Sequence, residues 1–309
     1  MRQRRGGPLD VLILGAGISG LTAACQSARM GLSVGLVEKA LPGGLVVNVG
    51  NLDGYPSARP TSGAELASAL RNDAVSLGVQ VIESEVTGLN LSSRPMAVET
   101  GTHAMPTHRA RAIVLAMGAA LSPFTVPGAD RLVGHGVSQC AFCDAGLYQG
   151  ETVVVVGGGN AALQEALHLT QFASEVVLVH RGNRLSAMPH YVARAAESPN
   201  MRFHWSTQVV EVLGRETVEG VRMTIGEGEE ASEISCRGVF PFVGLVPQTE
   251  LLPEGLLGRD GAVDVDELMA TSMPGVYAIG ALRAGFGGQL TNAVSDGSIV
   301  ARSVAAYLG

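Results

Sequence analysis

Charged residues are scarce in this sequence. Asp, Glu, Lys and Arg make up 16% of its 309 residues and aromatic residues 4%, whereas 46% are hydrophobic. A disordered chain has the opposite composition, so these shortages predict a folded protein that is long enough for two domains. The formal net charge of −7 argues against nucleic acid as the main partner and leaves a small molecule or a folded protein.

Cysteine is also rare, and four residues are too few for a disulfide scaffold in a chain of this length. Cys25 and Cys236 stand alone in apolar surroundings, which predicts buried thiols that behave as small hydrophobic side chains. Cys140 and Cys143 alone form a pair by sequence. One C-x-x-C without a second pair or a nearby histidine pair is a weak indication of zinc, so we expect no metal.

The C-x-x-C pair points to redox chemistry. Two thiols at this spacing can close into a strained, easily reduced disulfide. Asp144 follows Cys143 directly, and its carboxylate can move the proton that thiol–disulfide exchange requires. Asp144 can also serve as a helix N-cap, and the two roles are compatible. The sequence therefore predicts Cys140, Cys143 and Asp144 as the catalytic residues.

No membrane segment is expected near the start of the chain. The short basic stretch from Met1 to Pro8 is interpreted as a frayed terminus. Residues 11–28 carry no charge but contain the glycine, serine and threonine that a strand–turn–helix needs. The sequence predicts a cytoplasmic protein that does not associate with a membrane.

A strand–helix–strand unit opens the chain. Leu9–Leu14 is a continuous apolar run of the kind that forms a buried parallel strand. The glycine-rich segment Gly15–Gly20 follows and begins an apolar helix that runs to about Met30. The next strand, Ser33–Val37, ends at Glu38. This spacing is typical of a dinucleotide-binding fold.

The first glycine motif predicts a dinucleotide site. Gly15 allows a tight turn, Gly17 lets the backbone approach a pyrophosphate, and Gly20 lets the helix pack closely on the sheet. The helix N-terminus supplies N–H groups and a partial positive charge for phosphate. Glu38 stands where a carboxylate accepts both hydroxyls of an adenosine ribose.

The same plan is repeated later in the chain. Val153–Val156 is followed by a second glycine motif that opens a helix, and Glu175–Val179 is the strand after it. The spacing from Gly157 to His180 equals that from Gly15 to Glu38, and such a repeat is far more specific than one glycine motif. The residues predicted to bind the second nucleotide here are Gly157, Gly159, Asn160 and Ala161.

Basic residues replace the acid in the second unit. His180 occupies the acid's position, and Arg181 and Arg184 follow it. A carboxylate would repel a 2′-phosphate whereas an arginine can clamp it, so the sequence favours NADPH over NADH. The alternative is that these are solvated basic residues after a strand.

Two similar buried strands, at residues 112–118 and 238–244, each end in glycine. They mark the points at which the chain leaves one domain and returns to it. The predicted fold is therefore α/β, with two Rossmann-like nucleotide-binding domains and the second inserted into the first.

Taken together, these segments resemble the low-molecular-weight thioredoxin reductase family of flavoproteins, over nearly the whole chain. The matching segments are Gly15–Gly20 with Glu38, Pro42–Gly44, Tyr55-Pro56, Met117-Gly118, Gly136–Ser138 with Cys140–Asp144, Gly157–Ala162 with His180-Arg181, and Gly275–Gly280.

The resemblance implies a homodimer with two domains that rotate relative to each other during turnover. Residues 1–115 and 243–309 would form the FAD-binding domain, and residues 116–242 the NADPH-binding domain that carries the dithiol. Cys143 would face the flavin, Cys140 would attack the external disulfide, and Asp144 would shuttle the proton. The resemblance also implies FAD contacts from Gly43, Gly44, Gly118, Gly280, Gln289 and Leu290.

Four positions depart from the family pattern. Ala281 stands where the family has an aspartate beside the flavin's ribityl chain, Leu45 replaces a glutamine, and Gly54 replaces an asparagine. These three changes remove expected FAD contacts. Gly182 replaces the second arginine after His180 and weakens the NADPH clamp.

The function predicted from the sequence is an FAD-dependent NADPH:disulfide oxidoreductase. Its substrate would be a thioredoxin-like protein or a small disulfide. Two alternatives remain at this point: a flavin-dependent enzyme that oxidises dithiols with oxygen, and a non-enzymatic nucleotide-binding protein that senses redox state through its dithiol.

Overall fold

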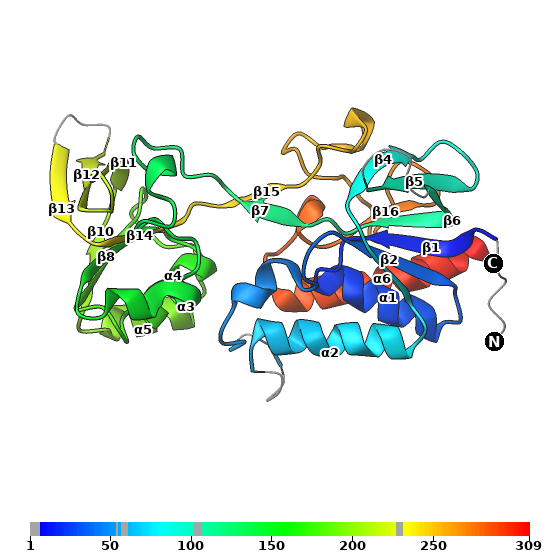
Figure 1. Cartoon of the computed structure of the whole chain (residues 1–309), viewed down its shortest axis with the longest axis horizontal. Helices are drawn as coiled ribbons and strands as arrows, with labels where there is room; N and C mark the ends of the chain where they lie inside the picture. Colours follow the sequence, from blue (N-terminus) through cyan, green and yellow to red (C-terminus); the bar gives the residue numbers. More distant parts are fainter. Residues whose placement is uncertain (1–6, 54, 57–60, 102–106, 227–230) are drawn as a thin grey trace. The chain divides into compact units, whose positions relative to one another are not determined.

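The chain folds into two compact units (Figure 1). The computed structural model describes residues 7–53, 55–56, 61–101, 107–226 and 231–309, so Gly54 lies outside the described residues. Unit 1 comprises Met1–Ala120 and Pro247–Gly309, and unit 2 comprises Leu121–Val246. Both boundaries fall a few residues after those expected from the sequence. Strands β7 (Ala119–Leu121) and β15 (Leu245–Pro247), in the two connecting segments, pair with each other.

A seven-stranded sheet forms the centre of unit 1, in the order β3-β2-β1-β6-β5-β4, with β16 also paired to β6. Strands β3, β2, β1, β6 and β16 run parallel, whereas β5 and β4 are antiparallel. The strands are β1 (Leu9–Leu14), β2 (Val34–Glu38), β3 (Gln80–Glu83), β4 (Val86–Asn90), β5 (Met96–Thr100), β6 (Thr107–Leu115) and β16 (Val276–Ala278).

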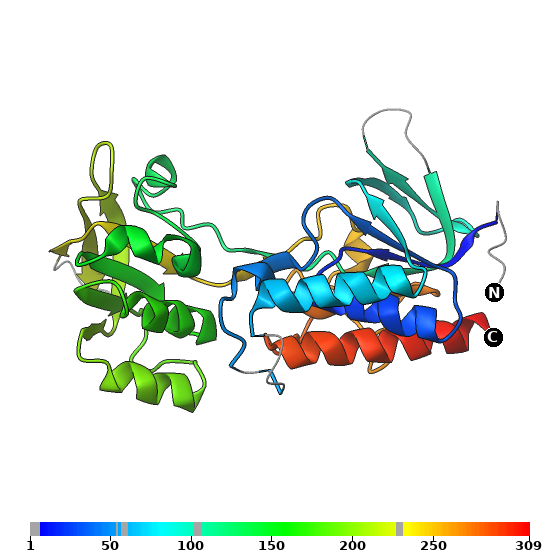
Figure 2. The ribbon, with the colours of Figure 1, turned by 60° about the horizontal axis from the view of Figure 1, so that its bottom comes forward.

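Three helices cover one face of this sheet: α1 (Ile18–Arg29), α2 (Gly63–Ser76) and α6 (Leu290–Leu308) (Figures 1 and 2). Side chains alternate between the faces of β1, so Val11 and Ile13 pack under the helices while Leu12 and Leu14 pack on the other side. Both faces are buried, which explains why this strand is a continuous apolar run in the sequence.

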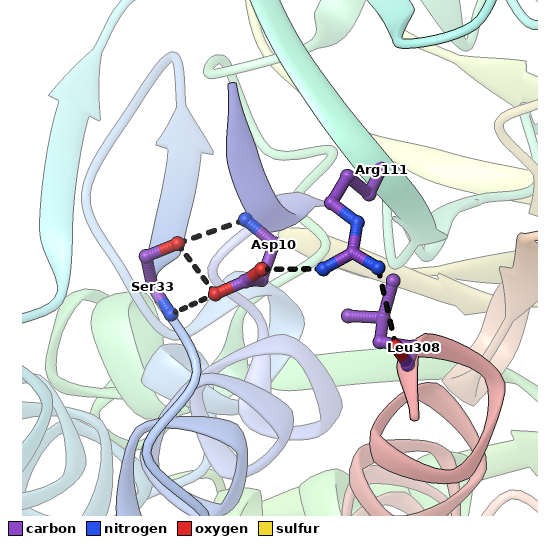
Figure 3. Close-up of polar contacts among 4 residues, drawn as sticks. All are labelled: Asp10, Ser33, Arg111 and Leu308. Atoms are coloured by element: carbon purple, nitrogen blue, oxygen red, sulfur yellow. Dashed lines mark hydrogen bonds and ion pairs between the residues drawn. The ribbon is translucent and has the colours of Figure 1, made fainter. Parts of the chain in front are cut away.

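A small hydrogen-bond network in unit 1 links β1, the residue before β2, β6 and the end of α6 (Figure 3). The carboxylate of Asp10 accepts hydrogen bonds from the backbone N–H and hydroxyl of Ser33, at 2.9 and 2.8 Å. Arg111 of β6 donates to Asp10 at 3.2 Å and to the carbonyl oxygen of Leu308 at 3.1 Å. Burial alone would raise the pKa of Asp10, but these hydrogen bonds outweigh it and lower the pKa.

Unit 2 contains a parallel sheet in the order β10-β9-β8-β14 and an antiparallel sheet in the order β11-β12-β13. The elements are α3 (Ala141–Asp144), β8 (Thr152–Gly157), α4 (Asn160–Leu169), β9 (Glu175–Val179), α5 (Pro189–Glu197), β10 (Met201–His204), β11 (Thr207–Leu213), β12 (Gly220–Ile225), β13 (Ala231–Ser235) and β14 (Gly238–Phe242). Val153 and Val155 pack against the helices, whereas Val154 and Val156 pack against β11 and β12.

Short 3₁₀ turns connect several of these elements: η1 (Gly44–Asn48), η2 (Asp130–Leu132), η3 (Ala145–Tyr148), η4 (Glu254–Leu256) and η5 (Gly280–Leu282). Among the described residues, no helix combines the length and the apolar character needed to cross a bilayer. The α/β fold with two Rossmann-like domains, one inserted into the other, is confirmed.

Candidate active site

The first glycine loop has the backbone geometry that a dinucleotide requires. Gly15 has φ of +105°, and a Cβ there would lie 2.3 Å from the carbonyl oxygen of Ala116. A Cβ on Gly20 would lie 2.0 Å from the carbonyl oxygen of Gly15. Gly17 is the N-cap of α1, and a Cβ there would meet no atom within 4 Å. The tight turn, the close packing and the open approach to the helix N-terminus therefore fit a bound pyrophosphate.

Glu38 is held at the end of β2 beside this loop. Its Oε2 atom accepts a hydrogen bond from the backbone N–H of Ala16 at 2.8 Å, and Oε1 accepts from Ala40 at 3.0 Å. Each carboxylate oxygen can accept a further bond. The side chain is thus fixed in place and retains the capacity to accept ribose hydroxyls.

The Pro-Gly-Gly segment lies against the same loop. The backbone N–H of Gly43 donates to the carbonyl oxygen of Ala16 at 2.7 Å, and a Cβ on Gly44 would lie 3.5 Å from the Cα of Gly17. Leu45 follows in η1 with 39% of its surface exposed. An apolar, exposed side chain therefore stands where a glutamine would offer hydrogen bonds.

Gly118, Gly280 and Leu290 also belong to unit 1. Gly118 and Gly280 both have φ of +70°, and a Cβ on Gly280 would lie 2.4 Å from the Oγ atom of Ser19, in the first turn of α1. Gln289 is the N-cap of α6, and Leu290 packs in the same apolar cluster as Ile18. Every residue predicted to bind FAD thus lies in unit 1.

A buried ion pair that the sequence analysis missed holds the turn around Gly280. The side chain of Asp296 is 3% exposed and that of Arg283 is 14% exposed. Asp296 accepts from the Gly280 N–H at 3.0 Å and from Nε and Nη2 of Arg283 at 2.7 and 2.9 Å. Residues 281–301 contain no other charged residue. Two opposite charges in an otherwise uncharged segment could have been used to predict this ion pair from the sequence. The pair ties α6 to η5, the turn that contains Ala281.

Replacing Asp296 by asparagine is expected to cost about 3–5 kcal/mol of unfolding free energy, because it leaves the guanidinium of Arg283 partly buried and unpaired. Denaturant unfolding of the two proteins measures this difference. Glu267→Gln, which removes a charge from an exposed residue of unit 1, is the control and is expected to change stability little. Equal stability of Asp296→Asn and the unmutated protein would contradict the role given to this ion pair.

In unit 2, the cysteine pair is joined. Cys140 and Cys143 form a disulfide with their Cα atoms 5.3 Å apart. Cys140 is the N-cap of α3, and its Sγ accepts from the backbone N–H of Cys143 at 3.2 Å. The N–H of Cys140 donates to the Ser138 hydroxyl at 3.1 Å, and the N–H of Ser138 donates to Val239 of β14 at 3.0 Å. The dithiol is therefore anchored to the edge of the parallel sheet.

Asp144 ends α3 directly after the dithiol. It occupies the N-cap position of η3, but its side chain makes no capping hydrogen bond there. At the start of α3, the N–H groups of Ala141 and Phe142 donate to Glu165 of α4, at 2.6 and 3.3 Å. Burial raises the pKa of the Tyr148 hydroxyl, and the charge of Asp144 raises it further.

The second glycine loop is built like the first. Gly157 has φ of +149°, and a Cβ there would lie 2.5 Å from the carbonyl oxygen of Phe242. Gly159 is the N-cap of α4, and Asn160 and Ala161 begin the helix. The Asn160 side chain accepts from the backbone N–H of Met188 at 2.7 Å. The loop therefore presents a helix N-terminus with the donor groups that a second pyrophosphate requires.

His180 lies against this second loop. A Cβ on Gly158 would lie 2.4 Å from its Nδ1, and a Cβ on Gly182 would lie 3.0 Å from its Nε2. Nε2 donates to the carbonyl oxygen of Arg184 at 2.9 Å. The His180 imidazole thus lies close to Gly182, and an arginine side chain at position 182 would have its Cβ in tight contact with the ring.

Trp205 contacts the ring of His180, and two basic residues follow His180 in the sequence. Arg181 and Arg184 are exposed, and Trp205, which is 41% exposed, meets the His180 ring edge-on at 6.3 Å between centroids. Trp205 also stacks on Phe203, and the sequence analysis missed it because its approach to His180 joins the ends of different strands. Arg181 and Arg184, which the sequence predicts as NADPH-binding residues, are thus accessible at the surface of unit 2.

The remaining cysteines are buried and unpaired with each other, which confirms the prediction. Burial raises the pKa of Cys25 and raises that of Cys236 to about 12. Because the thiolate is the reactive form, these thiols are unreactive at neutral pH.

Comparison with known proteins identifies the family. The profile of the pyridine nucleotide-disulphide oxidoreductase family matches residues 9–297. The thioredoxin reductase of Treponema pallidum is 35% identical over 300 residues, 97% of each chain, and that of Bacillus subtilis is 33% identical over 301 residues, 97% of this chain and 94% of the relative.

Solved structures agree. The Lactococcus lactis thioredoxin reductase matches with a TM-score of 0.93 and 30% identity, covering 97% of this chain and 99% of that one. The T. acidophilum thioredoxin reductase matches with a TM-score of 0.90 and 31% identity, covering 97% of this chain and 98% of that one.

The chain belongs to the pyridine nucleotide-disulphide oxidoreductase family. Its fold, its cysteine pair and these relatives make it an enzyme, an FAD-dependent NADPH:disulfide oxidoreductase of the thioredoxin reductase-like kind. The two glycine loops described above fit the two nucleotide cofactors that this activity uses.

Proposed function

We propose that this protein reduces the disulfide of a thioredoxin-like protein, with Cys140, Cys143 and Asp144 as its catalytic residues. The observation that carries the proposal is the Cys140–Cys143 disulfide at the start of α3. Phe142, between the two cysteines, is 52% exposed, and Leu147, just after them, is 78% exposed. An exposed apolar rim beside a dithiol suits a folded protein substrate better than a small polar disulfide.

The chemistry conserves electrons and protons. NADPH and one proton supply what is needed to convert the Cys140–Cys143 disulfide into two thiols, and FAD, when bound, carries the electron pair between them. Cys143 receives this electron pair. The Cys140 thiolate then attacks the substrate disulfide and forms a mixed disulfide, which Cys143 resolves as it restores the internal bond. Asp144 protonates the leaving thiolate of the substrate.

The residues that hold the cofactors follow the division into units. We propose that Gly15, Gly17, Gly20 and Glu38 bind the adenosine half of FAD in unit 1, Met1–Ala120 and Pro247–Gly309. Unit 2, Leu121–Val246, would bind NADPH through the second glycine loop. We further propose a homodimer, as the family resemblance implies, and a cytoplasmic location, because a dithiol reduced by NADPH fits a reducing compartment.

An anaerobic assay tests this function. With FAD bound, NADPH oxidation is expected to depend on added oxidised thioredoxin and to stop when that disulfide is exhausted. A small aromatic disulfide is expected to be reduced as well. Absence of disulfide reduction, together with oxygen uptake when a dithiol is supplied in air, would favour the oxidase instead.

Arg181 is expected to give the enzyme its preference for NADPH. Removing one charged phosphate contact costs about 1.5–3 kcal/mol, so Arg181→Ala is expected to lower kcat/KM for NADPH roughly ten- to a hundred-fold and to leave NADH little changed. The sole tryptophan, Trp205, lies beside His180, and its fluorescence is expected to change when NADP⁺ binds. Equal kcat/KM for the two cofactors, unaltered in Arg181→Ala, would contradict the assignment.

A further inference from the structure

The N-terminal N–H groups of α3 have an unexpected acceptor. A helix leaves its first N–H groups without partners inside the helix, and α3 has only four residues, Ala141–Asp144. The N–H of Cys143 points to the Cys140 sulfur at 3.2 Å. Those of Ala141 and Phe142 both donate to one oxygen of Glu165, at 2.6 and 3.3 Å.

Glu165 reaches the dithiol from the neighbouring helix. It lies on α4, the helix that follows the second glycine loop, and is partly buried where α3 packs on α4. Burial raises the pKa of its carboxyl group, and the two backbone hydrogen bonds oppose that rise. One turn further along α4, the ring of His168 contacts Phe142 at 5.4 Å between centroids.

Glu165 accepts the hydrogen bond of the Phe142 N–H, which a Cys140 thiolate at the N-cap could otherwise accept. An N-cap side chain accepts hydrogen bonds from the second and third residues of its helix, which here are Phe142 and Cys143. The Phe142 N–H is bound to Glu165, so one donor remains for the sulfur. A carboxylate next to the same helix end also disfavours a second negative charge.

We propose that Glu165 is a positioning residue of the dithiol, which holds the first turn of α3 and keeps Cys140 protonated until exchange begins. A thiolate that forms from a less acidic thiol is intrinsically the stronger nucleophile. Glu165 thus lowers the fraction of Cys140 present as thiolate and raises the intrinsic nucleophilicity of the thiolate that forms. The inference rests on the proposed function only in taking Cys140 as the exchanging thiol.

The variant Cys143→Ser leaves Cys140 as a free thiol in the full-length protein and provides the background for a test. Its alkylation by iodoacetamide is followed by mass spectrometry from pH 5 to 10, with and without Glu165→Gln. Glutamine keeps an oxygen for the two N–H groups and removes the charge. Glu151→Gln, which changes an exposed acid of unit 2, is the matched control.

Glu165→Gln is expected to increase the Cys140 thiolate about tenfold below the thiol's pKa. Because nucleophilicity falls as the pKa falls, alkylation at pH 7 is expected to be only about three- to fourfold faster. The pH of half-maximal rate is expected to move down, and Glu151→Gln to leave it unchanged. The same profile with and without Glu165→Gln would overturn the proposal.

Other titratable groups are unchanged in all these variants. On α4 and on the elements packed against it they are Asp144, His168, Glu175, His190, Tyr191, Arg194 and Glu197. The alkylation assay uses no NADPH and no disulfide substrate, so a failed proposal about Glu165 is distinguishable from a failed assignment of function.

A second measurement needs no substitution at Glu165. The amide signals of Ala141 and Phe142, labelled with ¹⁵N, are expected to shift together as the pH rises, with one midpoint above the ordinary glutamate value of 4.5. Both amides donate to one ionising oxygen, so both report its charge. Amide signals that do not titrate, or that titrate with different midpoints, would contradict the proposal even if Glu165→Gln does not fold.

Discussion

Cys143→Ser is expected to abolish NADPH-dependent disulfide reduction while leaving Cys140 able to form a mixed disulfide with the substrate. The internal disulfide cannot form without Cys143, so the electron pair has no path to Cys140. The mixed disulfide is expected to persist, because the resolving thiol is missing. Turnover with oxidised thioredoxin and mass spectrometry of the trapped adduct measure the two effects.

Cys140→Ser is expected to be equally inactive but different in colour. It leaves Cys143 as the thiol that the proposal places beside oxidised flavin, where a thiolate gives a long-wavelength charge-transfer band. Cys236→Ala is the control, because that thiol is buried and its pKa is raised to about 12. Activity comparable to the unmutated enzyme in either Cys140→Ser or Cys143→Ser would show that the cysteine pair is structural.

Asp144→Asn is expected to slow turnover by about 10²–10⁴-fold, the usual contribution of a general acid. Asparagine has nearly the same shape but cannot release a proton to the leaving thiolate. The side chain makes no capping bond in η3, so this substitution is expected to leave the fold unchanged.

The step that slows in Asp144→Asn shows whether Asp144 acts in proton transfer or in maintaining the structure. Flavin reduction by NADPH is expected at the normal rate, with the loss confined to exchange with the substrate disulfide. Stopped-flow absorbance followed by a substrate chase resolves the two stages. A variant with normal turnover would remove Asp144 from the mechanism, and a variant that has lost FAD would give it a structural role instead.

The sequence predicted the parallel strands well, because a strand buried on both faces is a continuous apolar run between turn residues. Leu9–Leu14 and Glu175–Val179 have the predicted bounds in the structure. The strands at 86–90 and 231–235 were missed as individual elements. They belong to antiparallel parts of the sheets, where solvated faces interrupt the apolar pattern.

The glycine loops were also predictable, since each backbone role there requires a particular residue type at a fixed spacing. Glu165 and the ion pair between Asp296 and Arg283 were not predicted. Glu165 acts on a helix more than twenty residues away in the sequence, and local spacing carries no information about such a contact.

The most direct test of the central claim, that electrons from NADPH reach the Cys140–Cys143 pair, is an anaerobic titration of the oxidised enzyme with NADPH, followed by absorbance. The unmutated enzyme is expected to take up about two equivalents per FAD, one for the flavin and one for the disulfide, each a two-electron acceptor. The double variant Cys140→Ser/Cys143→Ser is expected to take up about one equivalent and to reduce no substrate disulfide. Equal uptake by both proteins, with full disulfide reduction by the double variant, would contradict the account.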